Sequence, residues 1–358
     1  MSTPILSSAG LRRFQEIAPE AVDSVTRRFF AEHGDLYAKL GPRGRAACHE
    51  DLAFHLEFLR PVLEFGIIAP MVEYLRWLAS VLATRGIPSG HLTLSLDMLA
   101  EFFAATMEGP DAKITVRAMQ RIKERFLETD KAPSGAYGMM PERWPECDAF
   151  EDALLRGDRS GAGSLLDHTY ASGHTLVDAE MHIIQPALYD IGKRWQENQV
   201  TVAQEHLATA IAGSLMIKGL LGSDVPPANG RKVVLACVAG NMHVLGLQMV
   251  ADAFQLSGWE VQFLGANMPT EALIKHVGEQ TPELLGLSVS FPQQLRVVKD
   301  VMGRLRETFG AARPRVIVGG LAINQFDRLA DQLGSDAWRP DARSAVTFAS
   351  SLTAQPSH

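Results

Sequence analysis

The segment KVVLACVAGNMHVLGLQMV, residues 232–250, decides the fold of the carboxy-terminal part of the chain. Its first half is a run of apolar, β-prone residues, and its second half has the apolar spacing of an amphipathic helix. The loop between them carries Asn241, His243 and Gly246. In open α/β sheets, ligands bind at the carboxyl ends of strands, which is where this loop is predicted to lie. His243 is therefore a candidate metal ligand or acid–base group, or a surface histidine with a structural hydrogen bond.

Strand-like segments alternate with helix-length segments from Arg231 onward. The alternation predicts a doubly wound parallel sheet, a Rossmann-like domain over residues 226–350. The first strand is not followed by Gly-x-Gly-x-x-Gly, so a dinucleotide site is not expected. The predicted strands are Lys232–Val238, Glu260–Leu264, Leu284–Ser290 and Arg315–Val318.

Small and polar residues follow the predicted strands and leave room for a ligand. We expect Asn241 to hydrogen-bond one ring nitrogen of His243 and so to aim the other nitrogen at a metal. Gly246 would let a flat ligand approach the backbone closely. The other candidates at the strand ends are Gly265, Ser288, Ser290, Gly319 and Gly320.

Residues 150–225 are predicted to form a four-helix bundle. Ile184, Leu188, Ile191 and Trp195 recur at helical spacing, and Pro186 should kink the helix that carries them. The following helix is predicted to begin after Thr201, because Thr201 and Gln204 have the spacing of a capping box.

Residues 1–130 are predicted to be helical, with turns at Gly41-Pro42, Gly66, Gly86-Ile87-Pro88 and Gly109-Pro110. Residues 131–149 read as a linker and residues 351–358 as a disordered tail. One helical stripe in the first segment mixes apolar and polar side chains, with Asp51 at its border. Buried polar groups need partners, so the stripe indicates either a ligand or a core histidine satisfied by its neighbours. Its members are Arg45, Cys48, Leu52, His55 and Leu59.

Charge and composition limit the classes of function. The net charge is −7 and the pI is near 5.9, which argues against a nucleic-acid partner. We find no apolar run long enough to span a membrane and no signal peptide. Three widely spaced cysteines fit a reducing compartment, so we expect a cytoplasmic protein.

The loop Asn241-x-His243-x-x-Gly246, together with Ser288-Val289-Ser290 and Gly319-Gly320, resembles the cobalamin-binding domain family. The resemblance implies that His243 is the lower axial ligand of cobalt, that Ser288 bonds the base of the displaced nucleotide tail, and that the glycine pair lies along this tail. The family's usual loop begins with Asp, so Asn241 is a departure that gives the imidazole a neutral partner. Ser290 also stands where the family often has an apolar residue.

In the bundle, Trp195 and Glu205-His206 resemble the signature of light-sensing adenosylcobalamin proteins of the CarH type. The resemblance implies that these residues surround the 5′-deoxyadenosyl group. In that type, the residue after the tryptophan is a histidine that ligates cobalt after illumination, whereas this chain has Gln196. His182 or His206 could replace it, or water could.

The order of helical domain, bundle and cobalamin sheet is similar to that of photocobilins, which carry a globin-like bilin-binding domain. This implies that residues 1–130 bind biliverdin, with His55 and Asp51 near the pyrrole nitrogens and Arg45, Arg43 or Arg60 near the propionates. Haem with His55 as axial ligand is the rival interpretation.

The resemblances together imply a photoreceptor without enzymatic activity. Light would break the cobalt–carbon bond and change a subunit interface of a dimer or tetramer, and an unidentified output protein or domain would receive the signal. A corrinoid methyl carrier of a methyltransferase system and a haem-linked redox sensor are the alternatives.

Overall fold

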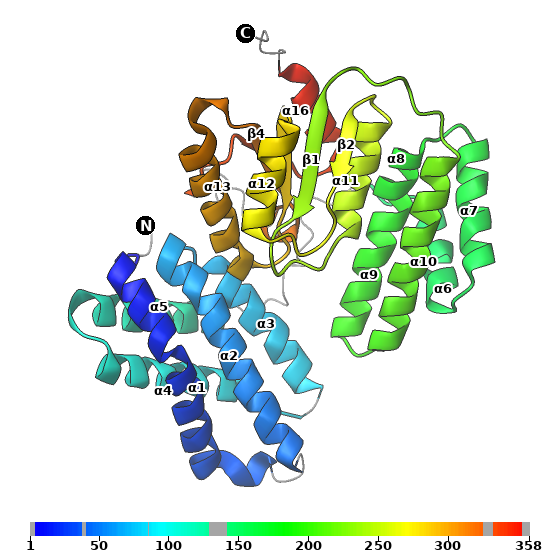
Figure 1. Cartoon of the computed structure of the whole chain (residues 1–358). Helices are drawn as coiled ribbons and strands as arrows, with labels where there is room; N and C mark the ends of the chain where they lie inside the picture. The colour runs from blue at the N-terminus through cyan, green and yellow to red at the C-terminus, as the bar shows by residue number, and fades with distance from the viewer. Residues whose placement is uncertain (1–3, 38–40, 85, 129–141, 325–331, 353–358) are drawn as a thin grey trace. The chain divides into compact units, whose positions relative to one another are not determined.

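The computed structural model describes residues 4–37, 41–84, 86–128, 142–324 and 332–352. The chain divides into two compact units, residues 1–134 (unit 1) and 135–358 (unit 2), coloured blue to cyan and green to red in Figure 1. In the described residues, no helix combines the length and the apolar character needed to cross a bilayer.

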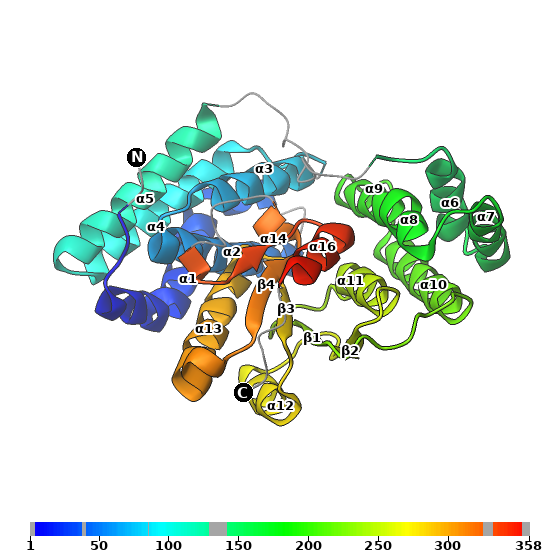
Figure 2. The same ribbon diagram turned by 90° about the horizontal axis from the view of Figure 1, so that it is seen from above.

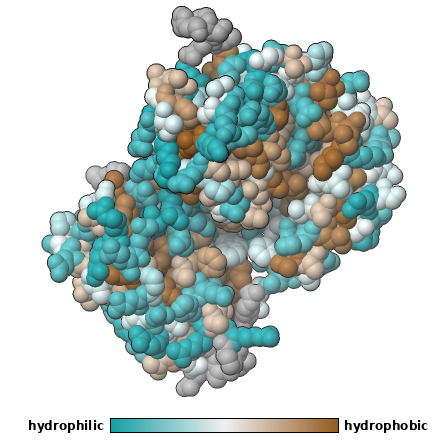
Figure 3. All heavy atoms as spheres, viewed as in Figure 1, coloured by the Kyte–Doolittle hydropathy of each residue, from teal (hydrophilic) through white to brown (hydrophobic). Residues whose placement is uncertain are grey.

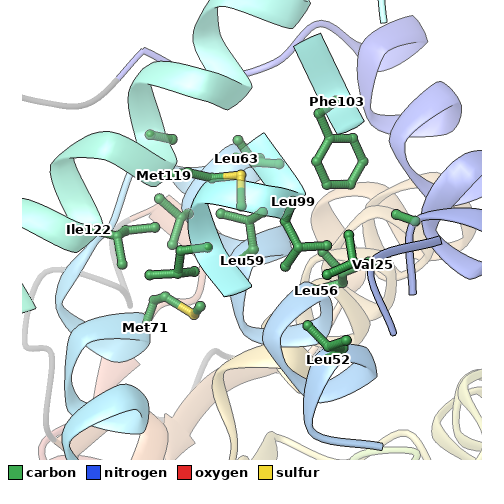
Figure 4. Close-up of a cluster of buried hydrophobic side chains, with 14 of the residues drawn as sticks. Val25, Leu52, Leu56, Leu59, Leu63, Met71, Leu99, Phe103, Met119 and Ile122 are labelled. Carbon is green, nitrogen blue, oxygen red and sulfur yellow. The ribbon is translucent and has the colours of Figure 1, made fainter. Parts of the chain in front are cut away.

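Unit 1 is helical, as the sequence predicts, and its helices begin or end at the predicted Gly and Pro positions. The helices bury a cluster of Leu, Met, Val and Phe side chains, part of which is drawn in Figure 4. The helices among the described residues of unit 1 are α1 (Ser8–Tyr37), α2 (Gly41–Phe65), α3 (Ala69–Ala83), α4 (Gly90–Thr106) and α5 (Gly109–Leu127).

The second half of unit 2 is the predicted doubly wound sheet. All strand pairs are parallel, and the order is β2-β1-β3-β4-β5. Helices α11 and α16 pack together on one face, and α12 and α13 on the other (Figure 2). The strands are β1 (Lys232–Cys237), β2 (Glu260–Phe263), β3 (Leu284–Ser288), β4 (Arg315–Gly319) and β5 (Ala337–Trp338); the helices are α11 (Leu245–Gln255), α12 (Thr270–Gln280), α13 (Leu295–Phe309), α14 (Leu321–Asn324) and α16 (Ala342–Ser351).

Four of these strands match the predicted ones to within two residues at each end, whereas β5 was missed. Its two residues are too few to carry an alternating pattern. The chain runs from β1 to β2 on one side of β1, and then crosses to β3 on the other side. The direction of strand order therefore reverses between β1 and β3. Such a switch point is the usual ligand site of this topology, and the loops after β1 and β3 flank it.

The first half of unit 2 is a bundle of four helical segments, as predicted. They are α6 (Glu146–Leu155), α7 (Arg159–Ala171), the continuous run of α8 (Leu176–Ala179), a π-helical turn (Glu180–Ile184) and α9 (Gln185–Gln196), and finally α10 (Val202–Leu221). The capping box of Thr201 and Gln204 is confirmed: each side chain bonds the other residue's backbone N–H.

The predicted kink at Pro186 takes the form of the π-helical turn that precedes it. Proline lacks an N–H and cannot bond the carbonyl of His182 four residues earlier. The backbone N–H of Trp144 donates to that carbonyl instead, at 3.1 Å, and the thiol of Cys147 donates to the carbonyl of Ile183 at 3.4 Å. The distortion thus fastens the segment leading into α6 to the middle of the bundle.

Most of the predicted linker, and residues 353–358 of the predicted tail, lie outside the described residues. Ser351 belongs to α16, so the last helix extends one residue into the predicted tail. The predicted domain boundaries otherwise remain predictions.

Gly320 tests how tightly the switch-point strands approach one another. Its φ is +96°, and a Cβ atom there would lie 2.5 Å from the carbonyl oxygen of Val289. We expect Gly320→Ala to lower the free energy of unfolding by about 1–3 kcal/mol. Gly303→Ala is the matched control, because Gly303 lies inside α13 with open space around it, and this change should stabilise by about 0.5–1 kcal/mol. Urea denaturation measures both, and equal effects would contradict the packing argument.

Candidate functional site

The loop between β1 and α11 holds His243 at the carboxyl edge of the sheet. Its ring contacts the ring of Phe291 edge-on, with centroids 5.1 Å apart. Burial lowers the pKa of His243 below its ordinary value, while the charge of Glu205 acts in the opposite direction. The imidazole is therefore neutral at neutral pH, which is the form that can ligate a metal ion.

Asn241 does not make the predicted bond to the ring of His243. This fully buried side chain accepts from the backbone N–H of His243 through Oδ1, at 3.1 Å, and donates through Nδ2 to the carbonyl of Ser288, at 2.9 Å. A carboxylate has no hydrogen to donate and could not bond that carbonyl. The amide thus joins the loop after β1 to the end of β3 and positions the backbone of His243.

Gln294 and Phe291 belong to the same edge, and the sequence analysis missed both. The buried Gln294 accepts from the backbone N–H groups of Ser290 and Phe291 through Oε1 and donates to the carbonyl of Gly240 through Nε2. It therefore joins the same two loops a second time. The available signal was a Pro-Gln-Gln stretch a few residues after a strand, but glutamine is too common in loops to single out.

The small residues at the strand ends separate into two groups. Gly246 and Gly265 have open space where a Cβ atom would stand, as expected beside a ligand. Gly319 and Gly320 instead face backbone atoms of Arg339 and Val289, so internal packing alone accounts for this pair. Ser288 is buried at the end of β3, and Ser290 is partly exposed in the loop that follows.

The bundle contributes Trp195, Glu205 and His206. Trp195 ends the predicted apolar stripe and remains 39% exposed, whereas Ile184 and Ile191 are buried. The carboxylate of Glu205 bonds His206 Nδ1 at 2.7 Å and accepts from Thr209 at 2.9 Å. Since Glu205 acts on the pKa of His243, the bundle residues and the β1 loop belong to one region of unit 2.

Large apolar side chains stay exposed around this region. Met242 is 67% exposed and Phe291 is 37% exposed. Figure 3 shows apolar patches over unit 2 among larger hydrophilic areas. The apolar face of a ligand could pack on these exposed side chains without a change in the helices.

His182 is placed unfavourably for the role of a cobalt ligand. Its ring stacks on Trp144 with centroids 4.7 Å apart, and its Nδ1 donates to the carbonyl of Glu142 at 2.6 Å. His206 is exposed on α10, and Gln196 ends α9. Of the two histidines predicted as substitutes, His206 therefore has the more accessible ring.

Unit 1 has a cavity of about 280 Å³ that is lined by Cys48, Asp51, His55 and Trp77, among others. His55 Nδ1 lies 2.5 Å from the carbonyl of Asp51, so this nitrogen carries the hydrogen, and Nε2 lies 3.5 Å from the hydroxyl of Ser95. Burial lowers the pKa of His55 to about 4 and raises that of Cys48 to about 11. The imidazole is thus neutral and the thiol protonated, which makes Cys48 a poor nucleophile. Arg45 is exposed near the start of α2, beside the Phe30 ring.

Comparisons with known proteins agree with the geometry of unit 2. Residues 231–347 match the family model of the B12 binding domain, and residues 146–217 match a second model with the same description. The chain thus contains a B12 binding domain and is similar to CarH. The HTH-type transcriptional repressor CarH of Myxococcus xanthus is 26% identical over 260 residues, which are 71% of this chain and 84% of that protein.

Corrinoid proteins are similar as well. Dimethylamine corrinoid protein 3 of Methanosarcina acetivorans is 30% identical over 136 residues, 37% of this chain and 63% of that protein. The structure of the monomethylamine corrinoid protein of Methanosarcina barkeri matches with a TM-score of 0.50 and 20% identity, over 58% of this chain and 98% of that one. This last likeness concerns the fold alone.

Asn241→Asp tests whether the amide donor holds the loop that carries His243 in place. The carboxylate would face the carbonyl of Ser288, so we expect a loss of about 1–3 kcal/mol of unfolding free energy at neutral pH. Protonation restores a donor, and this raises the pKa of the new acid in the folded state. The loss should therefore shrink as the pH falls. Asn229→Asp is the control, because Asn229 makes a longer, exposed bond to the carbonyl of Ser257, at 3.3 Å. Equal losses in both variants would contradict this role of Asn241.

Proposed function

We propose that the chain is a light sensor that binds adenosylcobalamin with His243 as the lower cobalt ligand. The observation that carries the proposal is the position of His243 in the switch-point loop, which Asn241 and Gln294 hold against the end of β3. When bound, the cofactor supplies a cobalt–carbon bond that visible light cleaves. The similarity to CarH and the residues Trp195, Glu205 and His206 support this finer assignment over cobalamin binding in general.

The chain's own residues have separable tasks in this proposal. His243 offers a ring nitrogen, and Asn241 and Gln294 keep its loop against β3. Trp195 offers a flat apolar wall, and Glu205, rigidly held in the first turn of the capped helix α10, orients His206. Gly246 and Gly265 leave open space at the strand ends.

Signalling would follow from a change in the contact between bundle and sheet. A ligand that interacts differently with two arrangements of the same unit shifts their populations. We propose that the shift alters self-association of the chain and so reaches a separate output protein, with no catalytic step of its own. A cytoplasmic location and the absence of nucleic-acid and membrane partners are parts of the same proposal.

An absorption spectrum of the full chain, loaded in the dark with adenosylcobalamin, tests the proposal. We expect the corrin bands to convert after a green flash, and His243→Ala to change the dark spectrum because the lower ligand is lost. His276→Ala is the control, since His276 lies on α12 and bonds Gln262. A dark spectrum that is the same in wild type and His243→Ala, or bands that ignore the flash, would overturn the assignment.

A corrinoid methyl carrier is the second candidate, favoured by the 30% identity to a dimethylamine corrinoid protein. A carrier has no use for a pocket that holds an adenosyl group. The double variant Trp195→Ala/His206→Ala would then bind adenosylcobalamin as well as wild type does, whereas the light-sensor proposal requires weaker binding.

For unit 1 we propose a globin-like role as a biliverdin-binding domain, with His55, Asp51 and Arg45 near the pigment. A mostly apolar cavity that carries a few polar side chains, Asp51, His55 and Ser95 among them, supports a ligand there. Its volume of about 280 Å³ is at the lower end for ligand sites, so a pigment of this size would require the helices to move apart. Haem is the rival, because His55 Nδ1 donates to a carbonyl and Nε2 is the nitrogen that could reach iron.

Purification with biliverdin supplied separates these ligands. We expect a protein-bound far-red band that Cys48→Ala retains, because a protonated thiol does not form a thioether readily. His55→Ala should lose the band, while His49→Ala should keep it, since His49 is exposed and pairs with Asp23. Stoichiometric iron in place of the bilin band would identify haem. If the protein bound neither pigment, the ligand proposal would be wrong and unit 1 would be an interaction domain.

A further inference from the structure

Two acidic side chains are buried against each other where the bundle meets the sheet. Glu180 lies in the π-helical turn and is 0% exposed, and Asp252 lies on α11 and is 1% exposed. Among the described residues, neither oxygen of Glu180 has a hydrogen-bond partner, and Oδ2 of Asp252 has none. Oδ1 of Asp252 accepts from Gln248 at 2.6 Å.

The other titratable groups around the π-helical turn do not neutralise this pair. Tyr170 of α7 is the group nearest in effect, because the charge of Glu180 acts on its hydroxyl. Three cationic side chains on the neighbouring elements are paired with other acids: Arg194 of α9 with Glu151 of α6, Lys218 of α10 with Asp167 of α7, and Arg343 of α16 with Asp178 of α8. The thiol of Cys147 on α6 donates to the carbonyl of Ile183.

Two ionised carboxylates in contact in a dry interface repel each other strongly, and each would also lose its hydration. Burial raises the pKa of Glu180 well above its ordinary value, and the charge of Asp252 raises it further. Burial also raises the pKa of Asp252, although a proton on the neighbouring Glu180 and the bond from Gln248 act against this. One proton shared by the two groups relieves the repulsion and gives an unpartnered oxygen its hydrogen bond.

The position of the pair connects the two halves of the candidate site. Helix α11 starts two residues after His243 and carries Asp252. The π-helical turn runs directly into α9, which carries Trp195. Figures 1 and 2 both show α11 between the sheet and the bundle. Relative movement of bundle and sheet must therefore separate Glu180 from Asp252.

We propose that Glu180 and Asp252 form a proton-dependent latch: the closed seam between bundle and sheet holds one proton between the two carboxyl groups, and opening of the seam releases it. The step balances as one carboxylic acid and one carboxylate becoming two carboxylates, with the proton passing to water. Tyr170 lines a groove of about 940 Å³ between α7, α8, α10 and the helices α11 and α16, and Ala253, the residue after Asp252, lines the same groove.

The sign of the pH effect follows from the raised pKa. The latch stabilises the closed seam fully below the ordinary carboxyl pKa, and its contribution is lost as the pH rises through the raised value. A single proton gives a limiting dependence of about tenfold in the opening equilibrium for each pH unit. The latch does not depend on cobalamin, so it can be tested in the full chain without the cofactor.

Hydrogen exchange of the full chain, read by mass spectrometry on peptides from α11 and residues 180–184, tests the latch. After correction for intrinsic exchange, we expect wild-type protection to fall with rising pH, by up to about tenfold per pH unit. Glu180→Gln should remove this dependence, since an amide donates to Asp252 at any pH. Peptides from β1 should not respond in either protein.

Asp152→Asn is the matched control, because Asp152 is an exposed acid of the same bundle, and it should behave as wild type. If Glu180→Gln fails to fold, Asp252→Asn serves in its place. In the infrared spectrum, the wild type should keep a protonated-carboxyl band to a higher pH than an ordinary carboxyl group does, and Asp152→Asn should do the same. Protection that is independent of pH in the wild type, an equal slope in Glu180→Gln, or no such infrared band would overturn the proposal.

Discussion

The amide of Asn241 is the interaction on which the rest of the site depends. It donates to the end of β3 and accepts from the backbone of His243, so two loops at the switch point become one surface. Gln294 repeats the connection from the other side. Without these bonds, the parallel pairing of β1 and β3 would fix the strands but would leave the loop that carries the candidate cobalt ligand without a defined position.

Some acidic groups in the bundle and at its contact with the sheet domain are paired with a cation. Arg194 neutralises the buried Glu151 inside the bundle, and Arg343 pairs with Asp178 across the seam to α16. Glu180 and Asp252 lie in the same seam without a cation, which is costly in a dry interface. A contact that combines ion pairs with an acid pair is well suited to two arrangements of similar free energy, as a switch requires.

At the π-helical turn, the missing N–H of Pro186 leads to a tertiary contact. Pro186 withdraws one N–H from the helix, and the freed carbonyl of His182 is used by Trp144. His182 then stacks on the ring of Trp144 and is held away from a ligand role. The residue that seemed to be one of two substitutes for the missing histidine at Gln196 is therefore committed to holding the bundle together.

Sequence patterns were enough to predict the helical first unit, the bundle with its capping box at Thr201, four of the five strands described in the sheet, and the loop that carries His243. These features follow from periodicity and short-range chemistry, which neighbouring residues define. Three contacts became known from the folded chain: Asn241 bonds Ser288 and not the imidazole, Val289 leaves room only for glycine at position 320, and Glu180 meets Asp252. Each of these contacts joins residues far apart in the chain, and no local pattern encodes which distant atom a buried polar group will find.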